Sequence, residues 1–64
     1  MWTAVYLATG LDAAIRIEEK LENEGFLVKK QLFSKEGDDE LYEILAPEFE
    51  ANEIQAVLFD LGII

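Results

Sequence analysis

Two stretches with helical spacing of apolar residues separate three short stretches with strand character, and this order permits few folds in so short a chain. Residues 2–8 hold aromatic and β-branched side chains and no charge, which predicts a largely buried strand. Residues 26–33 and 41–46 are the other two predicted strands. A polar loop over residues 34–39 is expected to join them, and Pro47 is expected to end the last strand.

The predicted helices span residues 11–24 and a second segment that begins at residue 48 or 50 and ends at residue 61. Thr9 followed by Asp12 resembles a capping box that would start the first helix. Gly25 is expected to close it in the left-handed conformation, and a glycine also follows the second helix. The predicted apolar faces are Ala14, Ile17 and Leu21 in the first helix and Ala51, Ile54, Val57, Leu58 and Leu61 in the second.

The β-α-β-β-α order predicts an α+β fold in one domain formed by residues 1–64. A right-handed crossover between the first two strands leaves room for the third strand between them. The expected result is a three-stranded antiparallel-type sheet of order 1-3-2 with both helices on one face. This is a truncated ferredoxin-like arrangement, a split β-α-β unit without its last strand.

The other face of the sheet is then expected to have no helix over it. Strict alternation along the strands predicts which residues point to each side. The residues expected to face the helices are Val5, Leu7, Val28, Tyr42 and Ile44. The residues expected on the opposite face are Trp2, Tyr6, Leu27, Phe33, Leu41 and Leu45, together with Lys29, Gln31 and Glu43. A shift of one residue would reverse the assignment, so Trp2 and Tyr6 either pack in the core or anchor an interface.

The apolar content predicts self-association. Hydrophobic residues make up 52% of the chain, although a domain of this size buries only about 60% of its unfolded surface. Cysteine and histidine are absent, so disulfides and the commonest metal ligand cannot supply stability, and oligomerisation is the usual remaining source. We therefore expect a homo-oligomer, formed through the uncharged first strand or through the open sheet face, that docks on another protein.

The charge balance argues against nucleic acid and membrane partners. Five basic against 14 acidic residues give a net charge of −9, which repels phosphate backbones and anionic lipid. Lys29, Lys30 and Lys35 beside aromatic residues are faintly similar to an RNA-recognition surface, but the basic-aromatic motif of that fold is missing. No basic side chain precedes Arg16, and no apolar run approaches 18 residues, so we expect a cytoplasmic protein.

We expect no catalytic residue, no metal and no cofactor. Without histidine or cysteine, no histidine-activated or thiolate nucleophile can form. The segment 36–40, four acidic residues and Gly37, lacks the ligand spacing of a calcium loop and indicates a solvated hairpin loop instead. Thr9 and Gly10, at a strand-to-helix turn, are a weak candidate for binding a small anionic ligand. The alternative function is therefore a small-molecule sensor similar to ACT or PII domains.

Three segments of the chain resemble a known family. They are Met-Trp-Thr-Ala-Val-Tyr-Leu-Ala at the start, Glu-Gly-Phe-Leu-Val-Lys after the first helix, and Tyr-Glu-Ile-Leu-Ala-Pro-Glu before the second. They are similar to very short bacterial proteins described as prokaryotic signal-transducing proteins. The resemblance extends from residue 1 to about residue 58. It implies a ferredoxin-like fold distantly similar to that of PII proteins, and it carries no catalytic or binding residue.

Overall fold

A computed structural model describes residues 1–64 and contains three strands, two α-helices and one short 3-10 turn. Their bounds are β1 Trp2–Thr9, α1 Leu11–Asn23, β2 Lys29–Glu36, β3 Asp39–Pro47, η1 Glu48–Glu50 and α2 Ala51–Asp60. β3 lies in the centre of the sheet and pairs antiparallel with both neighbours. The predicted α+β fold with sheet order 1-3-2 is therefore confirmed, and β3 ends at Pro47, one residue after the end of the predicted strand over residues 41–46.

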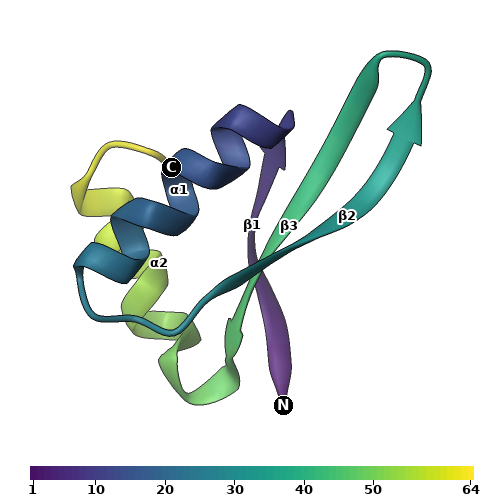
Figure 1. Cartoon of the computed structure of the whole chain (residues 1–64). Coiled ribbons are helices and arrows are strands. Elements are labelled where there is room, and N and C mark those ends of the chain that lie inside the picture. The colour runs from purple at the N-terminus through teal and green to yellow at the C-terminus, as the bar shows by residue number, and fades with distance from the viewer.

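The core lies between the sheet and the helices, which occupy the same side of the sheet (Figure 1). Ten buried residues, all hydrophobic, form one cluster, and the largest of them have no exposed surface. α1 contributes its predicted apolar face to this cluster. The fully buried large side chains are Leu21, Ile44, Ile54 and Leu58.

Both helices end in the same way, with a glycine of positive φ. After α1, Gly25 has a φ of 91°, and the N–H of Phe26 donates to the carbonyl of Leu21 at 3.0 Å. Gly62 closes α2 with the same pattern, which is a Schellman motif. Because this turn begins after Asp60, Leu61 lies outside α2 and is exposed, so its predicted place on the apolar face is wrong.

The predicted capping box is also wrong. Thr9 remains in β1, where it pairs with Leu41, and its side chain makes no hydrogen bond to the helix. Gly10 takes the N-cap position with a φ of 89°, a backbone conformation that side-chain-bearing residues rarely adopt. The strand is thus one residue longer than predicted, and glycine supplies the sharp turn into α1.

β2 begins later than predicted, at Lys29 rather than at Phe26. The N–H of Phe26 is occupied by the carbonyl of Leu21 in the turn that closes α1, so the strand cannot start there. Val28 is buried as predicted, whereas Leu27 lies before the strand with 61% of its surface exposed. The expected place of Leu27 on the sheet is therefore wrong.

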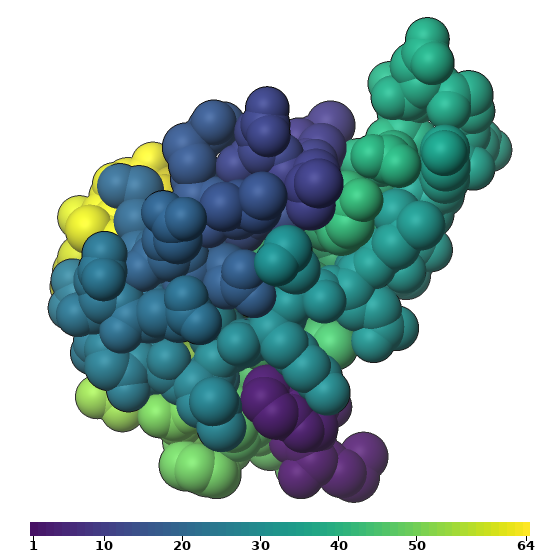
Figure 2. All heavy atoms as spheres, in the orientation of Figure 1, coloured from purple at the N-terminus to yellow at the C-terminus, as the bar shows by residue number.

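The β2–β3 hairpin is longer and its turn is tighter than the predicted loop over residues 34–39. The strands continue to Glu36 and Asp39, which pair, and only two residues form the turn. The first of these, Gly37, has a φ of 59°, and the second has no positive φ, which is the pattern of a type II′ turn. Beyond the Thr9 pairing the hairpin has no neighbouring strand, and it projects from the body as an arm (Figure 2).

Candidate functional site

A β-bulge in β1 decides which of its side chains reach the helix-free side of the sheet. Ala4 pairs with Leu45 and Tyr6 pairs with Ile44, so Val5 has no partner on β3. The extra residue shifts the phase of the alternation by one position. As a consequence Leu7 points away from the helices and is 47% exposed, although strict alternation predicted it to face them.

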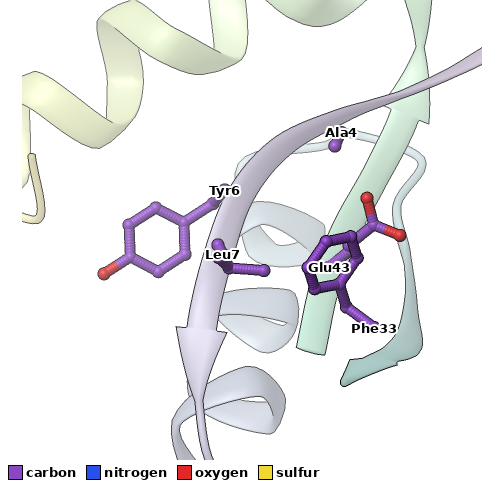
Figure 3. Close-up of a pocket in the computed structure, with 5 residues that line it drawn as sticks. All are labelled: Ala4, Tyr6, Leu7, Phe33 and Glu43. Atoms are coloured by element: carbon purple, nitrogen blue, oxygen red, sulfur yellow. The ribbon is translucent and has the colours of Figure 1, made fainter. Parts of the chain in front are cut away.

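The same bulge turns Tyr6 away from the helix-free side. Tyr6 is half-buried and packs against the core cluster, so its predicted outward position is wrong. Figure 3 shows the side chains of Tyr6 and Leu7 leaving β1 on opposite sides. No charged residue lies in β1 to mark the phase of its alternation, and the extra residue cannot be recognised from the sequence.

The remaining predicted residues do gather on one surface, which we call the open face. It consists of Trp2, Ala4, Leu7 and Thr9 from β1, Lys29, Gln31, Phe33 and Ser34 from β2, and Leu41, Glu43, Leu45 and Pro47 from β3. Cross-strand pairing places these residues in rows, with Leu45 between Ala4 and Lys29 and with Glu43 between Leu7 and Gln31. Phe33 is the unpaired residue of a second bulge, in β2, and is 58% exposed. Ala4 and Leu7 are members that the sequence reasoning missed.

Trp2 and Lys29 contact each other across one end of the open face. The Lys29 ammonium lies 4.2 Å from the centroid of the Trp2 ring, a cation–π contact. The two residues belong to the outer strands, so this contact spans the central strand. Trp2 is 40% exposed, and its ring remains partly available to an incoming surface.

The middle of the open face is hollowed. A cavity of about 290 Å³ is lined by four residues of this face, Ala4, Leu7, Phe33 and Glu43, and by Tyr6, whose side chain leaves β1 on the opposite side (Figure 3). Figure 3 shows Leu7, Phe33 and Glu43 gathered on one side of the sheet around this hollow. Glu43 takes part in neither of the two ion pairs of the molecule, so it has no cationic partner, and its neighbours in the hollow are Ala4, Leu7 and Phe33.

The two edges of the sheet are less open than the face. Beside β1, the side-chain amide of Gln55 in α2 donates to the carbonyl of Val5 at 2.6 Å, which occupies the edge at the bulge. β2 forms the other edge and carries Lys29, Lys30 and Lys35. Lysine on an edge strand is a common means of preventing strand addition. The uncharged first strand is therefore not the bare edge that the sequence predicted.

The three lysines of β2 do not form the basic cluster that the sequence suggested. Lys29 lies on the open face, whereas Lys30 lies on the helix side and forms a 2.9 Å ion pair with Glu18 of α1. This hydrogen bond and the charge of Glu18 raise the pKa of Lys30 above its ordinary value. Lys35 lies out on the arm, 3.8 Å from Glu40. The cations are therefore distributed among three separate surroundings.

The turn at Thr9 and Gly10 offers little to a ligand. The N–H of Gly10 is already bonded to the carbonyl of Glu40 at 2.8 Å. Thr9 is exposed and makes no hydrogen bond to the helix. Only the ordinary free amides of a helix start remain there. The structure also brings together no group of three or more acidic side chains that could hold a metal ion.

Comparisons with protein-family models, with curated proteins and with solved structures found no match to this chain. The resemblance to the signal-transducing family therefore stays a prediction from the sequence. Neither helix is long and apolar enough to cross a membrane. The functional argument consequently depends on the surfaces described above.

Proposed function

We propose that this protein is a non-catalytic interaction module that forms a homodimer through the open face. The observation that carries the proposal is the placement of Trp2, Leu7 and Phe33, three large apolar side chains with 40–58% of their surface exposed, on one helix-free face. A contiguous apolar surface of this kind marks an interaction site in small proteins. Aromatic side chains at its ends suit the role of interface anchors.

The state of the sheet edges supports the face over the first strand as the contact surface. Addition of a strand to β1 would displace the Gln55 hydrogen bond to Val5. Addition to β2 would bring its lysines into an interface, where a lysine without a partner is costly. Packing through the open face keeps the Gln55 bond, brings only Lys29 of the three lysines into the interface, and buries apolar surface.

The experiment is a measurement of mass in solution from about 1 μM to 100 μM, the range in which a small interface of micromolar affinity dissociates. We expect a dimer of about twice the chain mass of 7.3 kDa at the upper end of this range. Phe33→Lys places a charge on the open face and should shift the equilibrium to monomer.

The matched control is Phe59→Lys on α2. Phe59 is 70% exposed, so the same substitution is made on a different surface with a similar loss of apolar area. We expect this variant to dimerise as the unmodified chain does. A monomer throughout the concentration range would refute the proposal, as would a dimer that Phe59→Lys dissociates and Phe33→Lys leaves intact.

A further inference from the structure

Glu43 constrains what can cover the open face. The residue is partly buried, lines the hollow with Ala4, Leu7 and Phe33, and has no ion-pair partner within the chain. Water reaches it in the isolated molecule. An occupant that buries the hollow would remove this water, and a carboxylate buried without a partner is strongly unfavourable. The occupant must therefore supply a positive group or a strong hydrogen-bond donor at this point.

The open face itself carries such a group. Lys29 is the only cation among its twelve residues, and Glu43 is the only anion. They lie on neighbouring strands, two pairing positions apart, since Lys29 pairs with Leu45 and Glu43 pairs with Gln31. A surface with one positive and one negative group at separate points is complementary to a second copy of itself.

We propose that in the homodimer the open faces pack against each other with Glu43 of each chain against the partner's Lys29. This inference rests on the proposed function, because it assigns the contact within that dimer. In an isologous interface, a contact from one residue to another is repeated in reverse by symmetry, so two such ion pairs form. An ammonium group has three N–H donors, so Lys29 can keep its contact with the Trp2 ring while it binds the carboxylate.

Charge also distinguishes a second copy from other occupants of the face. An acidic peptide would leave Glu43 without a partner and would add a second negative group beside it. A basic peptide could satisfy Glu43 but would meet Lys29 as a like charge. A neutral apolar segment satisfies neither group. A second copy satisfies both with one arrangement.

The test uses two charge reversals, Lys29→Glu and Glu43→Lys, alone and mixed. Each variant alone places like charges opposite each other twice in the dimer, because both positions then carry the same sign. We expect the dissociation constant to rise by about 10-fold or more for each, since like charges in an interface are strongly unfavourable. In an equal mixture, a dimer of one variant with the other restores both opposite-charge pairs, and dimer formation should recover.

The controls are Lys20→Glu on α1 and Glu53→Lys on α2, two exposed positions that give the same changes in net charge. We expect both to dimerise as the unmodified chain does, and circular dichroism should show that all four variants fold. If the unmodified chain is a monomer, the proposed function itself fails. If it is a dimer but the mixed variants do not recover, the Glu43–Lys29 contact is wrong and the dimer uses another arrangement.

Discussion

The β1 bulge predicts that replacement by lysine has very different effects on folding at Val5 and at Leu7, two residues further along the strand. Without the bulge, Val5 and Leu7 would lie on the same face, and Val5→Lys and Leu7→Lys would both place an ammonium in the core. In the structure Val5 is 6% exposed and Leu7 is 47% exposed. We therefore expect Leu7→Lys to fold and Val5→Lys to be unfolded or nearly so.

The magnitudes follow from burial and chain length. Full burial of a leucine side chain contributes about 1.5–3 kcal/mol, so the half-buried Leu7 contributes about half of this, and the lysine stem recovers part of it. The expected cost of Leu7→Lys is about 1 kcal/mol. A domain of 64 residues has a total stability of about 3–10 kcal/mol, and burial of an unpaired ammonium costs several kcal/mol, which is comparable to the whole.

The assay is urea unfolding followed by Trp2 fluorescence, at a protein concentration low enough that the dimer is dissociated. Thr9→Lys is the control on the same strand, because Thr9 is exposed and its replacement should change the free energy of unfolding by less than about 0.5 kcal/mol. Loss of folding in Leu7→Lys as complete as in Val5→Lys would refute the bulge and the composition of the open face.

Three further predictions concern the edge, the turn and the ion pair. Gln55→Ala should lower the free energy of unfolding by about 0.5–1.5 kcal/mol through loss of one hydrogen bond. The control Asn52→Ala, at another exposed position of α2, should lower it by less when both variants are unfolded in urea. Gly25→Ala should cost about 1–2 kcal/mol from the positive φ alone, since an added Cβ meets no neighbouring atom, and should lower the melting temperature by about 4–8 °C per kcal/mol. The pKa of Lys30 is raised in the folded chain, so its pairing with Glu18 stabilises the fold. This stabilisation is complete below the unfolded lysine pKa of about 10.4, and it decreases as the pH rises through the pKa of Lys30 in the folded chain. The stability difference between the unmodified chain and Lys30→Met should therefore shrink above about pH 10.4, and a difference that is constant from pH 7 to 11 would contradict the pairing.

Elements with strong local signals could be predicted from the sequence. The helical spacing of Ala14, Ile17 and Leu21 gives the buried face of α1 directly, and Gly25 marks its end. In β3, the charge of Glu43 marks the side that faces away from the core, and alternation places Leu41 and Leu45 on that same side. The handedness of the crossover then sets the order of the strands. These signals together were sufficient for the topology and for the central strand of the open face.

The features that could not be predicted depend on which partner a residue takes, and the residues themselves do not indicate that partner. The β1 bulge has no local signature, because residues on both sides of Val5 are apolar and either phase buries apolar side chains. The hydrogen bond from Gln55 joins residues 50 positions apart, and glutamine is common on exposed helix surfaces. The Schellman turn that delays β2 depends on the bond from Phe26 to the end of α1, which competes with the strand for the same N–H group.

The bulge also explains why association should take place through the face rather than through the first strand. Val5 has no partner on β3, and its carbonyl instead accepts a hydrogen bond from the side-chain amide of Gln55 in α2. The same extra residue turns Tyr6 toward the core and Leu7 toward the helix-free side. One local irregularity thus leaves a carbonyl for Gln55 to occupy at the edge and exchanges Tyr6 for Leu7 on the apolar surface beside it. A chain with a regular β1 would have the opposite arrangement, with an open edge and with Tyr6 in place of Leu7 on the face, and would be expected to associate by strand addition.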